Sequence, residues 1–101
     1  MITCCIEYTI DPYQLGSFRQ FCEAWIPIIQ KYGGTHHGYF LPKESASDIA
    51  LGLFSFESLA MYESYREKCK DDDDAKAASK IASDTKCIVR INRQFLEPML
   101  P

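Results

Sequence analysis

The sequence predicts an α+β domain of the ferredoxin-like type, with elements in the order β-α-β-β-α-β. Four segments rich in apolar, β-branched or aromatic residues indicate strands, at residues 2–10, 35–42, 48–56 and 86–98. Residues with helical spacing lie between the first and second strands and between the third and fourth. A chain of 101 residues has the length of one domain. We therefore expect residues 1–101 to form a single domain with a four-stranded antiparallel sheet.

Composition and charge argue against several classes of protein. The formal net charge of −3 suggests no basic surface for nucleic acid or anionic lipid, and the apolar runs are too short to span a bilayer. The N-terminal residues MITCCIEYTI lack the basic region and long apolar stretch of a signal peptide. The five cysteines are odd in number and form no CxxC motif, which favours a reducing compartment. We expect a soluble, cytoplasmic protein without nucleic-acid or membrane partners.

The first strand and the helix after it carry local signals at their ends. Apolar and polar residues alternate with a period of two along residues 2–10, which predicts the strand. Asp11 suits a helix N-cap, and Pro12 suits the first helical position. The apolar stripe of the helix ends at the glycine pair 33–34, where a left-handed C-cap favours glycine. Pro27 lies inside this stripe, so we expect it to kink or interrupt the last turns.

A hairpin and a second helical region follow. The segment PKESAS carries turn-forming residues between the second and third strands. The segment ESLAMYESYREKC predicts a helix that Ser55 or Ser58 caps. The run Asp71–Asp74 looks at first like a cation site, but the spaced oxygens and central glycine of an EF-hand loop are absent. Because acidic residues suit the positive end of a helix dipole, we interpret this run as the start of the helix AKAASKIAS.

The expected strand order is 4-1-3-2, with the helices on one face of the sheet. Successive strand residues point to opposite faces, so the sequence assigns side chains to each face. The set expected beneath the helices is Ile2, Cys4, Ile6, Tyr8, Ile49, Leu51, Leu53, Cys87, Val89 and Ile91. The set expected on the open face is Thr3, Cys5, Glu7, Thr9, Ala50, Gly52, Phe54, Lys86, Ile88, Arg90 and Asn92.

The register of the hairpin decides where the two histidines point. If Gly38 pairs with Gly52, the open face also receives His36, Gly38 and Phe40, and His37 turns toward the helices. The open face would then mix aromatic rings with charged groups, which a monomer would leave exposed over a wide area. The same face of a second copy would cover it with two-fold symmetry. We therefore expect a homodimer that forms through the open sheet face.

Five segments, in order along almost the whole chain, resemble the small bacterial members of the NIPSNAP family. They are YTIDPYQL, WIPI, GGTHHGYFLP, FSFESLAMYESYR and CIVRINRQFL. The resemblance implies the dimeric α/β barrel, in which two ferredoxin-like units join sheet to sheet. It implies no single reaction, because that superfamily includes cofactor-free monooxygenases, lactone isomerases, aldoxime dehydratases and haem-handling proteins. Fold and family therefore do not fix the function.

The adjacent histidines in GGTHHGYF form the first candidate site. Neighbouring strand residues point to opposite faces, so His36 and His37 do not readily chelate one ion within one chain. No cluster of further potential ligands accompanies the two histidines. We therefore assign neither a metal nor a cofactor. Haem is an alternative in which His36 alone serves as the axial ligand. The sequence contains no further haem signature.

Acid–base catalysis by His36, Glu7 and Arg90 is the second hypothesis for the site. Glu7 lies on the predicted central strand and Arg90 on its antiparallel neighbour, so the two could pair across the sheet. Such a pair suits pocket chemistry, or else a structural ion pair at the dimer interface. Small residues such as Ala50 and Gly52 would leave volume there.

The sequence thus predicts a NIPSNAP-like homodimer of undefined biochemical role, whose barrel interior could bind a small, partly apolar molecule. Three alternatives stay open. The same pocket could serve a cofactor-independent monooxygenase or isomerase, or a haem-binding protein. The domain could also be a non-catalytic interaction module, in which case aromatic side chains would fill the interior.

Overall fold

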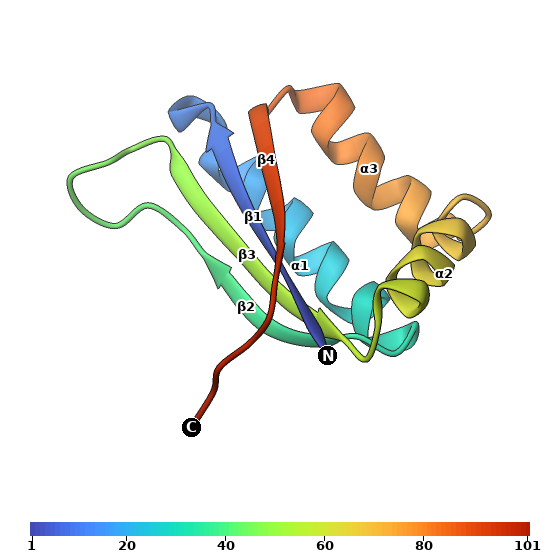
Figure 1. The fold of residues 1–101 in the computed structure, drawn as a ribbon. Helices are drawn as coiled ribbons and strands as arrows, with labels where there is room; N and C mark the ends of the chain where they lie inside the picture. Colours follow the sequence, from blue (N-terminus) through green and yellow to red (C-terminus); the bar gives the residue numbers. More distant parts are fainter.

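Four strands form one antiparallel sheet in the computed structural model, which describes all 101 residues, and three α-helices cover one face of that sheet (Figure 1). The strands are β1 (Ile2–Ile10), β2 (Thr35–Phe40), β3 (Ile49–Phe56) and β4 (Ile88–Leu96). The helices are α1 (Leu15–Lys31), α2 (Leu59–Cys69) and α3 (Asp73–Thr85), with a short 3-10 helix at Pro12–Gln14. The order β2-β3-β1-β4 confirms the expected sheet and the ferredoxin-like fold.

The ends of α1 follow the local signals in the sequence. The Asp11 carboxylate accepts a hydrogen bond from a backbone N–H two residues later, at 2.9 Å, and starts the 3-10 turn that leads into the helix. Gly33 adopts a φ of +93°, and the Gly34 N–H donates to the Ile29 carbonyl at 2.9 Å, as in a Schellman cap. α1 continues through Pro27 as one helix. None of the helices combines the length and the apolar character that crossing a membrane requires.

The acidic run begins α3, as expected. The buried Asp72 is the N-cap residue, and its Oδ1 accepts a hydrogen bond from the Ala75 N–H at 2.9 Å. Its Oδ2 accepts a second hydrogen bond from Lys31 Nζ at 2.6 Å and a third from the Tyr32 hydroxyl. One carboxylate therefore starts α3 and also ties it to the end of α1.

The register between β1 and β3 corrects the predicted faces of β3. Ile6 lies opposite Gly52 and Cys4 opposite Phe54, and directly opposed residues share a face. The helix-facing residues of β3 are therefore Ala50, Gly52, Phe54 and Phe56, and the open-face residues are Ile49, Leu51, Leu53 and Ser55. The prediction was wrong for this strand because both sets are apolar, so the alternation of residue types did not distinguish them.

The faces of β4 were predicted in part. Arg90 lies opposite Thr9 on the open face and Ile91 faces the helices, as expected. Ile88 instead lies opposite Ile10 on the helix face, because the pairing shifts by one residue at this end of β1. Val89 falls at this irregularity and is exposed, which contradicts its predicted place beneath the helices.

The hairpin register differs from the expected one. Gly38 lies opposite Leu53, and it is Tyr39 that lies opposite Gly52, because the pairing shifts between His36 and Gly38. The open face therefore carries Gly38 and also Phe40, as predicted. His36 lies opposite Phe54, so it shares the helix face.

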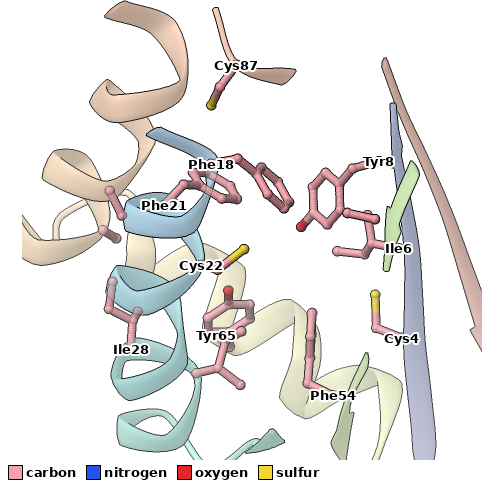
Figure 2. Close-up of a cluster of buried hydrophobic side chains, with 14 of the residues drawn as sticks. Cys4, Ile6, Tyr8, Phe18, Phe21, Cys22, Ile28, Phe54, Tyr65 and Cys87 are labelled. Carbon is pink, nitrogen blue, oxygen red and sulfur yellow. The ribbon is translucent and has the colours of Figure 1, made fainter. Parts of the chain in front are cut away.

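The core lies between the helix face of the sheet and the helices, and Figure 2 shows its aromatic part. The Tyr8 ring from β1 meets the Phe18 ring from α1 edge to face, with centroids 5.1 Å apart. All five cysteines are free. Burial raises the pKa of Cys4 to about 11 and that of Cys22 to about 12, so both thiols stay protonated at neutral pH. They fill the core as small apolar side chains.

The Asp72 cap predicts a specific loss of stability in acid. The hydrogen bond from Lys31, with those from Tyr32 and the Ala75 N–H, holds the pKa of Asp72 well below its usual range. The stability that this lowered pKa provides is present above about pH 4, the ordinary pKa of the group, and is lost as the pH falls below it. Asp72→Asn keeps the cap but removes the charge. We therefore expect its thermal unfolding temperature to fall less than that of the wild type between pH 5 and pH 2.

Circular dichroism melts at successive pH values measure this difference. Asp84→Asn is the matched control, because Asp84 forms an exposed ion pair with Lys80 on the same helix. The unfolding temperature of Asp84→Asn should fall with pH as that of the wild type does. Parallel curves for wild type and Asp72→Asn would contradict the role of Asp72.

Candidate functional site

A cleft of about 1170 Å³ opens on the helix side of the sheet. It lies among β1, β4 and the three helices, and hydrophobic residues make up 15 of the 24 that line it. The lining includes Ile6, Trp25, Tyr62, Arg66, Arg93 and Phe95. This volume is large enough for a drug-sized molecule, and its walls are mostly apolar with a few polar groups, as in small-molecule sites.

Aromatic side chains from three elements form much of the wall. Phe21 and Trp25 project from α1, with ring centroids 6.2 Å apart. Tyr62 of α2 meets Phe95 of β4 edge to face at 4.9 Å, so the helix and the edge strand close one part of the cleft. Such a wall offers flat rings for stacking and edge contacts with an unsaturated ligand.

Two guanidinium groups reach the cleft, and their surroundings differ. Arg93 projects from β4 opposite Ile6, so it lies on the helix face of the sheet. It forms no ion pair with a carboxylate. Arg66 on α2 donates a hydrogen bond from Nη1 to the Tyr62 hydroxyl at 3.1 Å. Arg66 is therefore held in place by a neutral partner, and Arg93 has no anionic partner within the chain.

Trp25 and two tyrosines of the lining also carry polar atoms. The Nε1 atom of Trp25 is buried within the wall, where it has no hydrogen-bond partner. Tyr8 and Tyr65 reach the same interior from opposite sides, one from β1 and one from α2 (Figure 2). Burial raises the pKa of both tyrosines, and that of Tyr39, far above neutral pH, so their hydroxyl groups stay protonated. The core placement predicted for Tyr8 is confirmed, and its side chain also borders the cleft.

The structure does not bring the three predicted catalytic residues together. Glu7 lies opposite Asn92 and Arg90 opposite Thr9, so these two side chains share the open face as neighbours on adjacent strands. The structure contains no ion pair between them. His36 lies on the other face of the sheet. A joint catalytic role for the three residues has no support in this geometry.

His36 is part of the helix-side packing. Its ring lies near Tyr39 and Phe54, with centroids at 4.7 and 5.9 Å. Nδ1 accepts a hydrogen bond from the Gly38 N–H at 2.9 Å, so the proton of the neutral ring resides on Nε2, which is buried and has no partner. Burial, and then the charge of neighbouring His37, lower the pKa of His36. The ring does not border the cleft, which leaves the haem hypothesis without an axial ligand there.

His37 takes the place on the open face that we expected for His36. Its Nε2 lies 2.7 Å from the hydroxyl of Ser55, and this hydroxyl also lies 2.7 Å from the hydroxyl of Thr3. Ser55 is only 1% exposed, because these two side chains cover it. The two histidines thus point to opposite faces, as strand geometry requires. No group of three or more potential ligands that could hold a metal ion occurs in the structure.

Sequence reasoning missed the residues that line the cleft, although Arg93 left a signal. Arg93 alternates with Ile91 and Phe95 in a period of two, so it is a cation on the apolar side of a strand. A charged residue at such a position often faces a pocket or a partner rather than a packed core. Trp25 and Arg66 gave no comparable signal in the sequence, because only the tertiary packing of α1 and α2 brings them to the same cleft.

The strand order and the three helices on one face of the antiparallel sheet place the chain in the ferredoxin-like class of α+β folds. The NIPSNAP family model matches residues 4–100. The chain therefore belongs to the NIPSNAP family.

Solved structures agree with this placement. A NIPSNAP family protein of unknown function from Agrobacterium tumefaciens superposes with a TM-score of 0.81 at 17% identity, covering 97% of this chain and 87% of that chain. An uncharacterized NIPSNAP-like domain protein from Burkholderia xenovorans gives 0.78 at 21% identity, covering 97% and 84%. A protein from Nitrosomonas europaea, proposed to be an antibiotic biosynthesis monooxygenase, gives 0.76 at 6% identity, covering 99% and 100%. At these identities the likeness shows the fold alone. Among curated proteins, none matches the chain in sequence.

The environment of His36 predicts a second pH effect on stability. Its pKa is lowered in the folded state, so the unfolded chain binds a proton more readily than the folded one as the pH falls. Stability should therefore decrease as the pH drops from about 6.5, the ordinary pKa of histidine, toward the lowered value. His36→Gln cannot take up this proton.

Urea unfolding at pH 7.5 and pH 5 measures the difference. We expect the free energy of unfolding to fall between these pH values in the wild type, and to fall less in His36→Gln. This window lies above that of Asp72, so the two effects can be separated. Equal slopes for both proteins would refute the role of His36.

Proposed function

We propose that this chain is a small-molecule-binding protein that acts as a homodimer, with its ligand in the helix-side cleft. The observation that carries the proposal is the cleft itself, with its large volume and its aromatic wall. A concave site with mostly apolar walls and a few polar groups is typical of small-molecule binding. These features support binding rather than a purely structural hollow.

The proposed site differs from the one expected at the sequence level. That expectation placed the ligand on the open sheet face, beside small residues of β3. Gly52 instead lies beneath the helices, where the Tyr39 ring packs over it and a Cβ atom would lie 2.8 Å from that ring. The position therefore holds no spare volume. The hollow lies farther along the same face, toward β4.

The open face supports the homodimer. It presents Phe40, which is 52% exposed, and Leu96, which is 50% exposed, with Leu51 and Leu53 half-buried between them. The face also carries the exposed polar residues Glu7, Arg90 and Asn92, and such a mixture of apolar and polar side chains is typical of an interaction surface. A second copy of the same face covers it with two-fold symmetry and closes the two sheets into a barrel. The five free cysteines fit a reducing compartment, which favours the cytoplasm.

A cofactor-independent enzyme of the oxygenase or isomerase type is the second candidate, for the same cleft. The tyrosine hydroxyls favour it, because protonated donors in a desolvated site can stabilise a developing oxyanion. Catalysis would also need a general base, and no histidine lines the cleft to serve as one. The carboxylates of the lining, Glu63 and Glu67, are exposed. For this reason we rank binding above catalysis.

Filling the cleft should abolish binding. Ala82 of α3 is partly buried and lines the cleft, whereas Ala77 on the same helix does not. We expect N-phenyl-1-naphthylamine, an uncharged aromatic probe, to bind the wild type, and Ala82→Phe to weaken it about tenfold or more because the new ring takes the ligand's volume. Ala77→Phe is the matched control and should bind like the wild type. Fluorescence titration measures all three, and failure of the wild type to bind counts against the proposal.

Charge on the open face should separate the dimer. Leu51→Glu places a carboxylate at the centre of the proposed interface, where burial without a partner is costly. We expect light scattering to give twice the chain mass of 11.6 kDa for the wild type, and a dissociation constant raised about a hundredfold for the variant. Leu59→Glu is the control, because Leu59 is exposed on α2 away from this face. Phe40→Glu is a second interface variant. Unchanged dimers in both interface variants, or a monomeric wild type, contradict the interface.

A further inference from the structure

We propose that the ligand of the cleft is an anionic aromatic or conjugated molecule whose acidic group binds Arg93. This inference rests on the proposed function, because it names the chemical class that the same site accepts. Three observations carry it: the charge of the lining, the absence of a carboxylate partner for Arg93, and the arrangement of aromatic rings around it.

The charge of the cleft is opposite to that of the protein. Five cationic side chains line it, Arg66, Lys70, Lys76, Lys80 and Arg93, against two carboxylates, Glu63 and Glu67. The excess of three positive charges lies in a chain with a formal net charge of −3. A concave surface with one sign of charge and apolar walls concentrates ligands of the other sign. The cleft is therefore suited to an anion.

Existing contacts within the chain leave three of these cations, Arg66, Lys76 and Arg93, without a carboxylate partner, and of the three only Arg93 lies on the sheet. Lys70 pairs with Glu67 at 3.0 Å, and Lys80 pairs with Asp84. Arg66 is engaged with the Tyr62 hydroxyl. Arg93 has no carboxylate partner, although it lies on the sheet face that packs against the helices. A guanidinium group offers two parallel N–H donors to a carboxylate, sulfonate or phosphate, which fixes the anion in one orientation.

The surroundings of Arg93 favour an unsaturated body for the ligand. Arg93 lies two residues from Phe95, whose ring meets that of Tyr62, and Trp25 projects from α1 into the same cleft. Flat rings pack against such walls at low entropic cost. An aliphatic acid would satisfy Arg93 but would leave the rings of the wall without matching partners.

Two fluorescent probes that differ by one anionic group test the inference. They are 8-anilinonaphthalene-1-sulfonate and the uncharged N-phenyl-1-naphthylamine. Because Arg93 is exposed in the empty protein, we expect the full-length wild type to bind the sulfonate about five- to tenfold more tightly. Arg93→Gln should remove this preference while leaving the affinity for the uncharged probe within about twofold. Arg19→Gln, on the exposed surface of α1 outside the cleft, is the matched control and should keep the preference.

The outcomes separate this inference from the proposed function. A wild type that binds both probes equally, or a preference that survives in Arg93→Gln, overturns the anionic class and leaves the binding function standing. Absence of binding by either probe overturns both. Ala82→Phe locates the bound probe, since sulfonate binding that survives this substitution takes place outside the cleft and overturns the assignment. Circular dichroism of Arg93→Gln confirms that any loss is not due to unfolding.

Discussion

The pairing of Ile6 with Gly52 in the β1–β3 register is the constraint on which both faces of the sheet depend. Glycine is required there by packing, because the Tyr39 ring occupies the space of a side chain. Gly52 of β3 also lies opposite Tyr39 of β2. The position of Gly52 therefore fixes the alignment of three strands. A slip of β3 by one residue would move all of its side chains to the opposite face of the sheet. Phe54 would then leave the core.

This alignment gives the two faces different chemistry. The helix face carries the aromatic core and, toward β4, a hollow that the helices do not fill. On the open face, Thr3, Ser55 and His37 satisfy one another's hydrogen-bonding groups beside leucine side chains. Glu7 and Arg90 also lie on this face without an ion-pair partner in the chain, so a second copy that covers the face would have to pair them. Under the proposed function, association and ligand binding therefore use opposite sides of one sheet, and neither competes with the other.

The sequence was sufficient for the elements and their order, because the signals are local. Asp72 and the glycines after α1 lie where capping chemistry predicts them. The assignment of faces required information that is not local. Both sides of β3 are apolar, and the irregularity after His36 changes which histidine meets the open face, so parity alone could not place them. Arg93 was visible as a cation in an apolar alternation, but its freedom from carboxylates is a property of the folded chain.

Trp25 has a consequence for the optical behaviour of the protein. It is the single tryptophan of the chain, and its indole lies in the wall of the cleft rather than in the sealed core. The emission of an indole shifts with the polarity and hydrogen bonding around its N–H, and here that N–H has no partner of its own. The tryptophan fluorescence of this protein therefore comes from one wall of one hollow. The native chain carries its own reporter of whether that hollow is filled, without any label or substitution.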